Sequence, residues 1–354
     1  MKYETFNHWV AKYSFKKFKI VAKNHDSCII ISLDDLGPGE ILILMIRGAI
    51  CNSDIHTLQG RRQEPVPSVL GHEGCGSVLL SRRDGVNPGD RVTFSVTDIC
   101  GTCLYCVQGP EQKCVQVYKY GHVQYVKYPQ GCYSTHLLLR AGTLVVQLPD
   151  ILSFDSAASA NCALATMVAA RRTALNILGD RSTEGSCLIY GAGILGIYGA
   201  VLMKDSGFEV SISDPSPGRI QTAEKYGAKG VSGEEIDSSY FDLIIEACGV
   251  GRIVETALPR LEPGGVLVLV GTVTPETRFT LSGESLVRQC GSIVGVHNYK
   301  QSDLQVGVRF LERTSQVYDY SVLSSQPIPL SRFNSALELA KQNTYHRVLL
   351  DLTK

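Results

Sequence analysis

The sequence lacks a charge imbalance, and it contains no internal repeat and no low-complexity segment. Lysine and arginine together number 34, and aspartate and glutamate also number 34. A balanced charge gives no strong electrostatic attraction for nucleic acid or for an anionic membrane. We therefore expect a small-molecule partner, and neither nucleic acid nor a membrane.

Long apolar runs are missing too. The first twenty residues, MKYETFNHWVAKYSFKKFKI, contain no apolar core of a secretory signal peptide. The longest early apolar run, ILILMI at 41–46, is far shorter than the roughly 20 residues that span a bilayer, and it suits a buried strand. Twelve cysteines in so long a chain without such a signal favour a reducing compartment over a disulfide framework. We expect a cytoplasmic protein.

The length of the chain, 354 residues, exceeds what one hydrophobic core usually supports, so two domains are expected. From residue 28 to about 150, short apolar runs such as IIISL, ILILMI and RVTFSV are broken by Gly, Pro and Asp, a pattern typical of an antiparallel β barrel or sandwich. From 163 to about 297, strand-like runs alternate with helical stretches, which indicates a parallel sheet with crossover helices. After 298 we expect one more helix, SALELAKQ, and a final strand, RVLLDL, that returns to the first domain.

Four cysteines lie within fifteen residues, in the stretch DICGTCLYCVQGPEQKC. Their spacing, C-x2-C-x2-C-x7-C, suits one tetrahedral zinc ion held by four thiolates, as in closed structural sites. Such a site stabilises a lobe and performs no chemistry by itself. The alternatives are disulfides or unrelated free thiols, which so tight a spacing disfavours. The four residues are Cys100, Cys103, Cys106 and Cys114.

Three glycines, Gly191, Gly193 and Gly196, follow a strand-like run and open a helical one in CLIYGAGILGIYGA. The spacing G-x-G-x-x-G alone is weak evidence, but this context is the one that binds a dinucleotide pyrophosphate at a helix N-terminus. Asp214 ends the run EVSISD, eighteen residues after Gly196. A carboxylate there accepts hydrogen bonds from the adenine ribose and repels a 2′-phosphate, so NAD is favoured over NADP. The alternative is a glycine-bearing turn with a solvated aspartate.

A dispersed set of zinc-ligand residue types consists of Cys51 in CNSDIH, His72 in GHE and Cys162 in SANCALAT. A catalytic zinc needs three protein ligands and one open position, and two cysteines with one histidine are a known solution. Each residue alone has a structural explanation, because cysteine is among the most buried residue types. Their order relative to the four-cysteine loop and the glycine motif favours the metal site.

Taken in order, these motifs resemble the zinc-dependent alcohol dehydrogenases of the medium-chain dehydrogenase/reductase superfamily, from about residue 30 to the C-terminus. The resemblance implies an α/β fold with two domains. A GroES-like β-barrel catalytic domain, residues 1–155 and 299–354, carries the structural zinc lobe. A Rossmann domain with a doubly wound parallel sheet, residues 156–298, binds the coenzyme. The stretches NCALATMVAA and GVHNY are more weakly similar to a subgroup associated with phosphonate metabolism.

The resemblance implies roles for the residues that match the family motifs. Cys51, His72 and Cys162 match the catalytic zinc ligands, and the four-cysteine loop matches the structural zinc ligands. Glu73 matches a glutamate that approaches the metal during ligand exchange. Asp54 matches a carboxylate that orients the metal-bound histidine.

Further matches concern proton transfer and the coenzyme. Ser53 falls where the family has a hydroxyl touching the substrate oxygen, and His56 where a histidine with a pKa of about 6.5 passes the proton onward. Arg347 matches a basic residue near the coenzyme pyrophosphate, with a solvated surface arginine as the alternative. Asn52 stands where several relatives have a basic residue. The remaining expected coenzyme contacts are Thr166, Ile194, Leu195 and Arg219.

The sequence thus predicts an NAD-dependent and zinc-dependent alcohol dehydrogenase, with two zinc ions per chain, that interconverts an alcohol with an aldehyde or ketone. Zinc would lower the pKa of the alcohol so that hydride can leave for NAD. The resemblance also implies a homodimer or homotetramer. Two alternatives stay open: a zinc-independent quinone or enone reductase of the same superfamily, which generally lacks this ligand set, and a non-catalytic NAD-binding protein, which Ser53 and His56 disfavour.

Overall fold

The computed structural model describes residues 9–14, 17–22, 28–124, 130–182 and 184–354. The chain forms two compact units, one of Met1–Cys162 with Lys300–Lys354 and one of Ala163–Tyr299. The first segment was predicted to end at residue 155 instead. Residues 156–162 join the first unit because Asn161 is hydrogen-bonded to the backbone of His72 and Gly74 in that unit.

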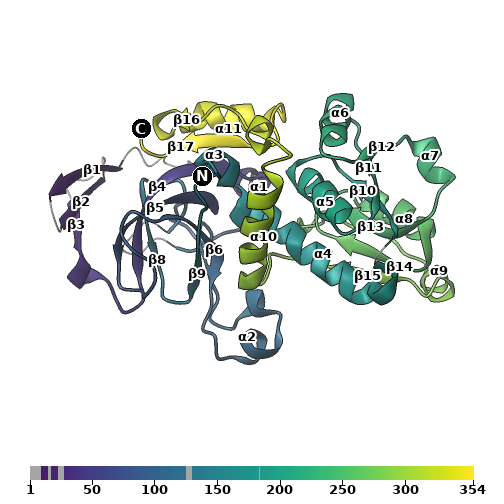
Figure 1. Ribbon diagram of the computed structural model, residues 1–354, viewed down its shortest axis with the longest axis horizontal. Helices are drawn as coiled ribbons and strands as arrows, with labels where there is room; N and C mark the ends of the chain where they lie inside the picture. Colours follow the sequence, from purple (N-terminus) through teal and green to yellow (C-terminus); the bar gives the residue numbers. More distant parts are fainter. Residues whose placement is uncertain (1–8, 15–16, 23–27, 125–129, 183) are drawn as a thin grey trace. The chain divides into compact units, whose positions relative to one another are not determined.

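The first unit is built on a predominantly antiparallel sheet in the strand order β16-β17-β4-β5-β6-β7, with β8 paired to β4 and β9 paired to β6 (Figure 1). Its central strand β4 is buried along most of its length because β5, β8 and β17 all pair with it, so the run ILILMI is core, as predicted. The strands are β4 (Ile41–Ile50), β5 (Glu73–Ser81), β6 (Arg91–Asp98), β7 (Tyr118–Lys119), β8 (His136–Leu139), β9 (Thr143–Gln147), β16 (Ile328–Pro329) and β17 (Val348–Asp351).

A separate three-stranded antiparallel sheet precedes this one in the chain. It consists of β1 (Trp9–Ser14), β2 (Lys17–Ala22) and β3 (Cys28–Ser32), in the order β1-β2-β3. The run IIISL, which the sequence analysis assigned to the barrel, contributes most of β3 and pairs with β2. That assignment was wrong because the strand immediately before it in the chain supplies its antiparallel partner.

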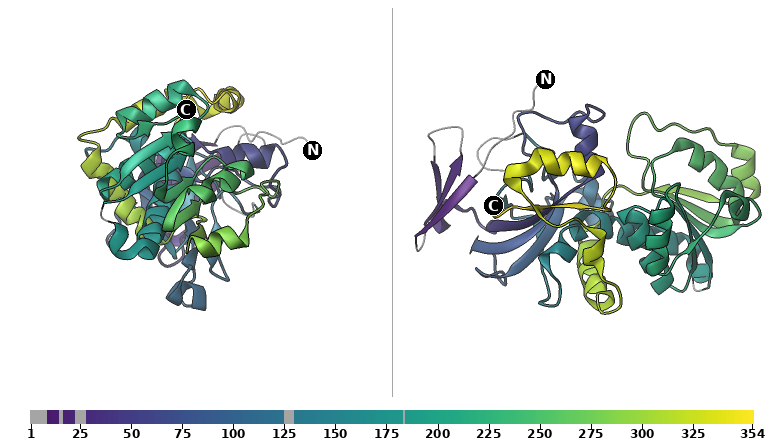
Figure 2. Two further views of the ribbon diagram at one scale, coloured as in Figure 1. Left: turned by 90° about the vertical axis from the view of Figure 1, so that its right-hand side faces the viewer. Right: turned by 90° about the horizontal axis from the view of Figure 1, so that it is seen from above.

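The helices of the first unit include one that the sequence analysis missed. Only one helix was expected after residue 298, yet α10 precedes α11 and packs on β6 and β9. Its buried Leu304, Val308 and Leu311 recur at helical spacing, so the signal was present in the sequence. Helix α11 packs on β17, as the view from above shows in yellow (Figure 2). These helices are α1 (Asn52–Leu58), α2 (Leu104–Gln108), α3 (Phe154–Ala157), α10 (Gln301–Thr314) and α11 (Phe333–Lys341).

The second unit contains the predicted Rossmann-type parallel sheet, in the order β12-β11-β10-β13-β14-β15. Strands β10 and β13 are central and almost wholly buried, which explains their continuous apolar sequences. The strands are β10 (Ser186–Tyr190), β11 (Glu209–Ser213), β12 (Lys229–Gly230), β13 (Phe241–Glu246), β14 (Leu261–Leu269) and β15 (Ser292–Gly295).

Among the described residues of this unit, helices α4 to α9 accompany the sheet, and α5 and α6 join successive parallel strands. They are α4 (Ala165–Leu178), α5 (Ile194–Asp205), α6 (Pro217–Lys225), α7 (Gly233–Asp237), α8 (Gly251–Ala257) and α9 (Gly283–Arg288). Within the described ranges, every helix is too short or too polar to cross a bilayer. Strand order reverses at β10, which has β11 on one side and β13 on the other, and this switch point is where ligands bind such sheets.

Candidate functional site

One potential metal site forms where three distant chain segments meet in the first unit. The ligand atoms of Cys51, His72, Glu73 and Cys162 all lie within 4.8 Å of one another. Cys51 follows β4 and caps α1, and His72 immediately precedes β5. Because β4 and β5 pair antiparallel, the end of one lies beside the start of the other. Cys162 lies in a π-helical turn, Ala160–Leu164.

Polar neighbours fix the orientation of the metal-ligand candidates. Asp54, which is buried, places Oδ1 3.3 Å from Nδ1 of His72, while Tyr133 donates to Asp54 Oδ2 at 2.7 Å. The contact with Asp54 leaves His72 Nε2 on the cysteine side, as expected for a ligating histidine. The Ser53 hydroxyl donates to Cys51 Sγ at 3.3 Å and lies 3.3 Å from His72 Nε2. Tyr133 was not foreseen from the sequence, because its partner is far away along the chain.

Hydrogen bonds, burial and neighbouring charges shift the pKa values of Cys51, Cys162 and His72 in different directions. A hydrogen bond from Cys162 holds the pKa of the Cys51 thiol well below its usual value. The same contact, together with burial, raises the pKa of Cys162 well above its usual value. Burial would lower the pKa of His72, but Asp54 and Cys51 overcome it and raise the pKa to about 10. Two cysteine sulfurs and an imidazole bind a divalent cation in their deprotonated forms, so metal binding here would release protons.

Arg347 lies against this cluster. The residue is 8% exposed, and its guanidinium forms a two-pronged ion pair with Glu73, with Nε–Oε2 at 2.8 Å and Nη2–Oε1 at 2.9 Å. Nη2 is also 3.8 Å from Cys51 Sγ. The surface-arginine alternative is therefore wrong. The expected contact with a coenzyme pyrophosphate stays a prediction.

Asn161 links the two halves of the cluster. Its side chain is fully buried, accepts a hydrogen bond from the Gly74 backbone N–H at 3.1 Å and donates one to the His72 carbonyl at 3.1 Å. The amide therefore ties the backbone on both sides of Glu73 to the segment that carries Cys162. Asn161 was not predicted as a site residue, although a polar side chain inside the apolar stretch SANCALAT was a usable signal.

The second potential metal site is the predicted four-cysteine lobe. Its four ligand atoms lie within 4.8 Å of one another, with Sγ–Sγ distances of 3.5 Å between Cys103 and Cys106 and 3.9 Å between Cys100 and Cys106. A tetrahedral ion with arms of about 2.3 Å places its sulfur ligands about 3.8 Å apart, so the lobe fits zinc. All four cysteines are free, and the disulfide alternative is wrong. The backbone N–H of Thr102 lowers the pKa of Cys100 to about 6, which favours the ligating thiolate.

The glycine motif of the second unit has the geometry of a phosphate-binding turn. Gly191 follows β10 with φ +103°, a conformation that side chains rarely adopt. A Cβ on Gly196 would lie 1.9 Å from the Gly191 carbonyl oxygen, so only glycine fits there. Gly193 caps α5, and Ile194 and Leu195 form its first turn.

Asp214 and Arg219 lie beside this turn. Asp214 follows β11 and accepts hydrogen bonds from the backbone N–H groups of Ala192 and Ser216, both at 2.8 Å. The Arg219 guanidinium would be 3.6 Å from a Cβ placed on Gly193. Thr166 lies in the first turn of α4. The coenzyme contacts of these residues stay predictions.

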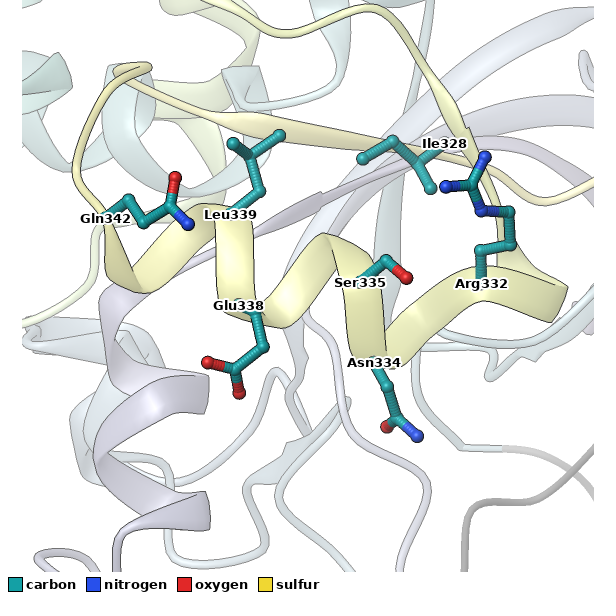
Figure 3. A pocket seen from close by; sticks show the side chains of 7 residues that line it. All are labelled: Ile328, Arg332, Asn334, Ser335, Glu338, Leu339 and Gln342. Atoms are coloured by element: carbon teal, nitrogen blue, oxygen red, sulfur yellow. The ribbon is translucent and has the colours of Figure 1, made fainter.

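A surface pocket of about 580 Å³ lies elsewhere, along α11 (Figure 3). It shares no residue with either cysteine cluster, so it is not where the ligand chemistry gathers. Its lining residues are Ile328, Arg332, Asn334, Ser335, Glu338, Leu339 and Gln342.

His122 and Glu64, which lie near the buried cluster, were not predicted from the sequence. The ring of His122 lies 5.0 Å from the ring of His72, centroid to centroid, and its Nδ1 is 2.9 Å from Glu64 Oε1. The signal was the stretch KYGH at 119–122, which follows the four-cysteine lobe and begins with Lys119.

Fold and sites together define a two-unit dehydrogenase with a GroES-like domain, a Rossmann-type domain and two potential metal centres. Comparison with known families agrees with this class. Residues 37–150 match the alcohol dehydrogenase GroES-like domain, and residues 172–350, about half of the chain, match the glucose dehydrogenase C-terminus.

Relatives and solved structures extend the match to most of the chain. An alcohol dehydrogenase of Geobacillus stearothermophilus is 30% identical over 308 residues, covering 79% of this chain and 88% of the relative. A D-altritol 5-dehydrogenase of Agrobacterium fabrum is 28% identical over 307 residues, covering 84% and 87%. The crystal structure of an alcohol dehydrogenase from Thermotoga maritima aligns with a TM-score of 0.81 at 26% identity, covering 97% of this chain and 98% of that one. The chain belongs to the zinc-dependent alcohol dehydrogenases of the medium-chain dehydrogenase/reductase superfamily.

Proposed function

We propose that the protein is an NAD-dependent and zinc-dependent alcohol dehydrogenase that interconverts an alcohol with an aldehyde or ketone. The observation that carries the proposal is the convergence of Cys51, His72 and Cys162, with the Ser53 hydroxyl touching two of them. Relatives named as alcohol and polyol dehydrogenases support the same reaction type.

Cys51, His72 and Cys162 would hold the catalytic zinc, because two sulfurs and an imidazole nitrogen form a known catalytic ligand set. When bound, zinc supplies Lewis acidity that lowers the pKa of the alcohol. Asp54 holds the His72 ring in its ligating orientation. Arg347 pairs with both carboxylate oxygens of Glu73 and partly offsets burial, which raises the pKa of Glu73 to about 7.

Residues of helix α1 would remove the proton of the alcohol. Ser53 Oγ lies beside the metal ligands and is positioned to accept the alcohol proton. His56 stands three residues further along the same helix, so the two side chains share one helical face. This spacing supports a relay from Ser53 towards His56.

The coenzyme would bind in the second unit, with its pyrophosphate at the N-terminus of α5 and its adenine ribose on Asp214. Asp214→Ala is expected to raise the ratio of kcat/KM for NADP to that for NAD about tenfold, since a hydrogen bond to a charged group contributes at least about 1.5 kcal/mol. Steady-state kinetics with both coenzymes tests this. An unchanged ratio would remove Asp214 from the coenzyme site.

The four-cysteine lobe would hold a second, structural zinc and support self-association into a homodimer or homotetramer. Three apolar side chains on the lobe are strongly exposed: Leu104 at 62%, Val107 at 71% and Val115 at 68%. These exposed apolar side chains are available for a protein contact. Sedimentation of Val107→Asp against the wild type tests the idea, and an unchanged mass would contradict it.

Coenzyme reduction with a panel of primary alcohols, secondary alcohols and polyols tests the main proposal. Turnover that disappears on zinc removal and returns on zinc addition is the expected result. Reduction of enones by a zinc-stripped enzyme would favour the zinc-independent alternative. Coenzyme binding without turnover of any alcohol or carbonyl would favour the non-catalytic one.

A further inference from the structure

A buried carboxylate lies at the carboxyl end of β13 and has no part in the chemistry proposed above. Glu246 is the last residue of this strand, and its exposed fraction is 0%. Among the described residues, its side chain contacts backbone N–H groups and one hydroxyl, and no cation forms an ion pair with it. Burying a carboxylate without a cation is costly unless hydrogen-bond donors are held against it, so these donors have fixed positions.

The two oxygens of Glu246 join two loops. Oε1 accepts hydrogen bonds from the backbone N–H of Cys248, at 2.8 Å, and from that of Gly249. Oε2 accepts a hydrogen bond from the Thr272 hydroxyl at 2.8 Å. Cys248 and Gly249 belong to the loop that follows β13, and Thr272 belongs to the loop that follows β14. One side chain therefore connects the loops at the ends of two neighbouring parallel strands.

The same two loops are in close backbone contact. A Cβ on Gly271 would lie 2.5 Å from the Gly249 nitrogen, and a Cβ on Gly249 would lie 2.8 Å from the Gly271 carbonyl oxygen. The Thr277 hydroxyl donates to the Gly249 carbonyl at 3.2 Å. The loops therefore pack without side chains between them, and Glu246 supplies the acceptors that hold them in this arrangement.

These loops adjoin the glycine turn. A Cβ on Gly191 would lie 3.2 Å from the Ala247 carbonyl oxygen and 3.2 Å from Cys248 Cβ, so the loop after β13 packs on the turn after β10. The sheet places β11 on one side of β10, and β13 and then β14 on the other. Asp214 follows β11. A coenzyme with its adenosine on Asp214 and its pyrophosphate at the turn therefore extends its nicotinamide half over the loops after β13 and β14.

We propose that Glu246 is a positioning residue for the nicotinamide half of the coenzyme. It acts through the backbone of Cys248 and Gly249 and through Thr272, which it holds at the separation that the nicotinamide riboside requires. The adenosine and the two phosphates bind at the glycine turn and at Asp214, and they do not depend on this carboxylate. The inference rests on the proposed coenzyme site and assigns the residue that organises its second half.

Two ligands separate the halves of the coenzyme site. NADH contains both halves, whereas ADP contains the adenosine and two phosphates but no nicotinamide riboside. In calorimetry with zinc-loaded protein, Glu246→Ala should raise the Kd for NADH at least about tenfold, because donors of both loops lose their buried acceptor. The Kd for ADP should stay within about twofold of wild type. Glu209→Ala, which removes an exposed glutamate at the start of β11, is the matched control and should leave both constants unchanged.

A second pair of variants tests the contact from the other side. Thr272→Val keeps the shape of the side chain but lacks the hydroxyl, and it should raise the Kd for NADH about fivefold without changing that for ADP. Thr272→Ser keeps the hydroxyl and should restore the Kd for NADH to within about twofold of wild type. This pair decides the inference if Glu246→Ala does not fold, and equal losses in the Val and Ser variants would contradict it.

The outcomes separate a positioning role from a merely structural one. If Glu246→Ala weakens NADH and ADP equally, the residue stabilises the whole unit and the inference fails. An unchanged Kd for NADH also overturns it. If wild type binds NADH but oxidises no alcohol, the proposed function fails, and the ratio of the two Kd values still decides the role of Glu246. If wild type binds no nicotinamide coenzyme, the proposed function and the inference fail together.

Discussion

The two cysteine clusters of this protein are built in opposite ways. The ligands of the four-cysteine lobe lie within fifteen residues, three of them half-buried, and local turns with backbone N–H groups orient the sulfurs. The ligands of the second cluster are separated by up to 111 residues, and the fold of the first unit brings them together. A local site can be identified from spacing alone. A dispersed site depends on the packing of every segment that delivers a ligand.

The largest effect on turnover should follow loss of a ligand from the dispersed cluster. Cys162→Ala is expected to lower kcat/KM at least about 1,000-fold, because several kcal/mol of transition-state stabilisation depend on the metal. NAD binding, measured by fluorescence titration, should be unchanged. Turnover near the wild-type level would show that another residue holds the metal and would remove the functional contrast between the clusters.

A smaller effect, a loss of metal affinity, is expected when the residue that orients a metal ligand is replaced. Asp54→Asn weakens the orientation of His72, and we expect a 10–100-fold decrease in metal affinity. Competition with a chromogenic chelator measures it. Tyr133→Phe, which removes one hydrogen bond to the same carboxylate, should have a smaller effect in the same direction. If Tyr133→Phe matched or exceeded Asp54→Asn, Asp54 would not be the residue that orients His72.

The Asn161→Ala variant tests whether packing between distant segments brings the ligands of the dispersed cluster together. Asn161→Ala leaves the Gly74 N–H and the His72 carbonyl without their buried partner, at a cost of about 1–3 kcal/mol per group. Zinc affinity of the buried site should fall while that of the lobe stays unchanged. The exposed Asn334→Ala, on α11, is the control. Equal weakening of both metal sites would mean that Asn161 stabilises the unit as a whole.

The smallest effect on turnover should come from the lobe. Cys103→Ala is expected to remove the lobe's metal and lower the midpoint of thermal unfolding by about 5 °C or more. The kcat per remaining zinc should stay within about twofold of wild type. A loss of turnover as large as that of Cys162→Ala, in protein that is still folded, would contradict the division of roles.

Much of this arrangement was predictable from the sequence because it is local. The lobe, the glycine turn with Gly191 and Gly196, and the alternation of the second unit all follow from spacing and periodicity. The parallel sheet was also predictable, because strands that are buried on both faces have continuous apolar sequences.

Other features depend on contacts between residues far apart in the sequence. The ion pair of Glu73 with Arg347 joins residues 274 positions apart, and Asn161 contacts a strand 87 positions away. Helix α10 was not predicted, although its apolar residues recur at helical spacing. Gly307, a poor helix former, lies in the middle of this pattern. The run IIISL matched a barrel strand in composition, but composition does not specify which strand it pairs with.

Zinc content per chain, measured by elemental analysis of chelator-washed wild type and of Cys162→Ala, tests the central claim most directly. Two metal centres with separate roles predict two zinc ions in the active wild-type chain and one in the inactive variant, held by the four-cysteine lobe. Near one zinc ion in active wild type, or two in the variant, would contradict the account.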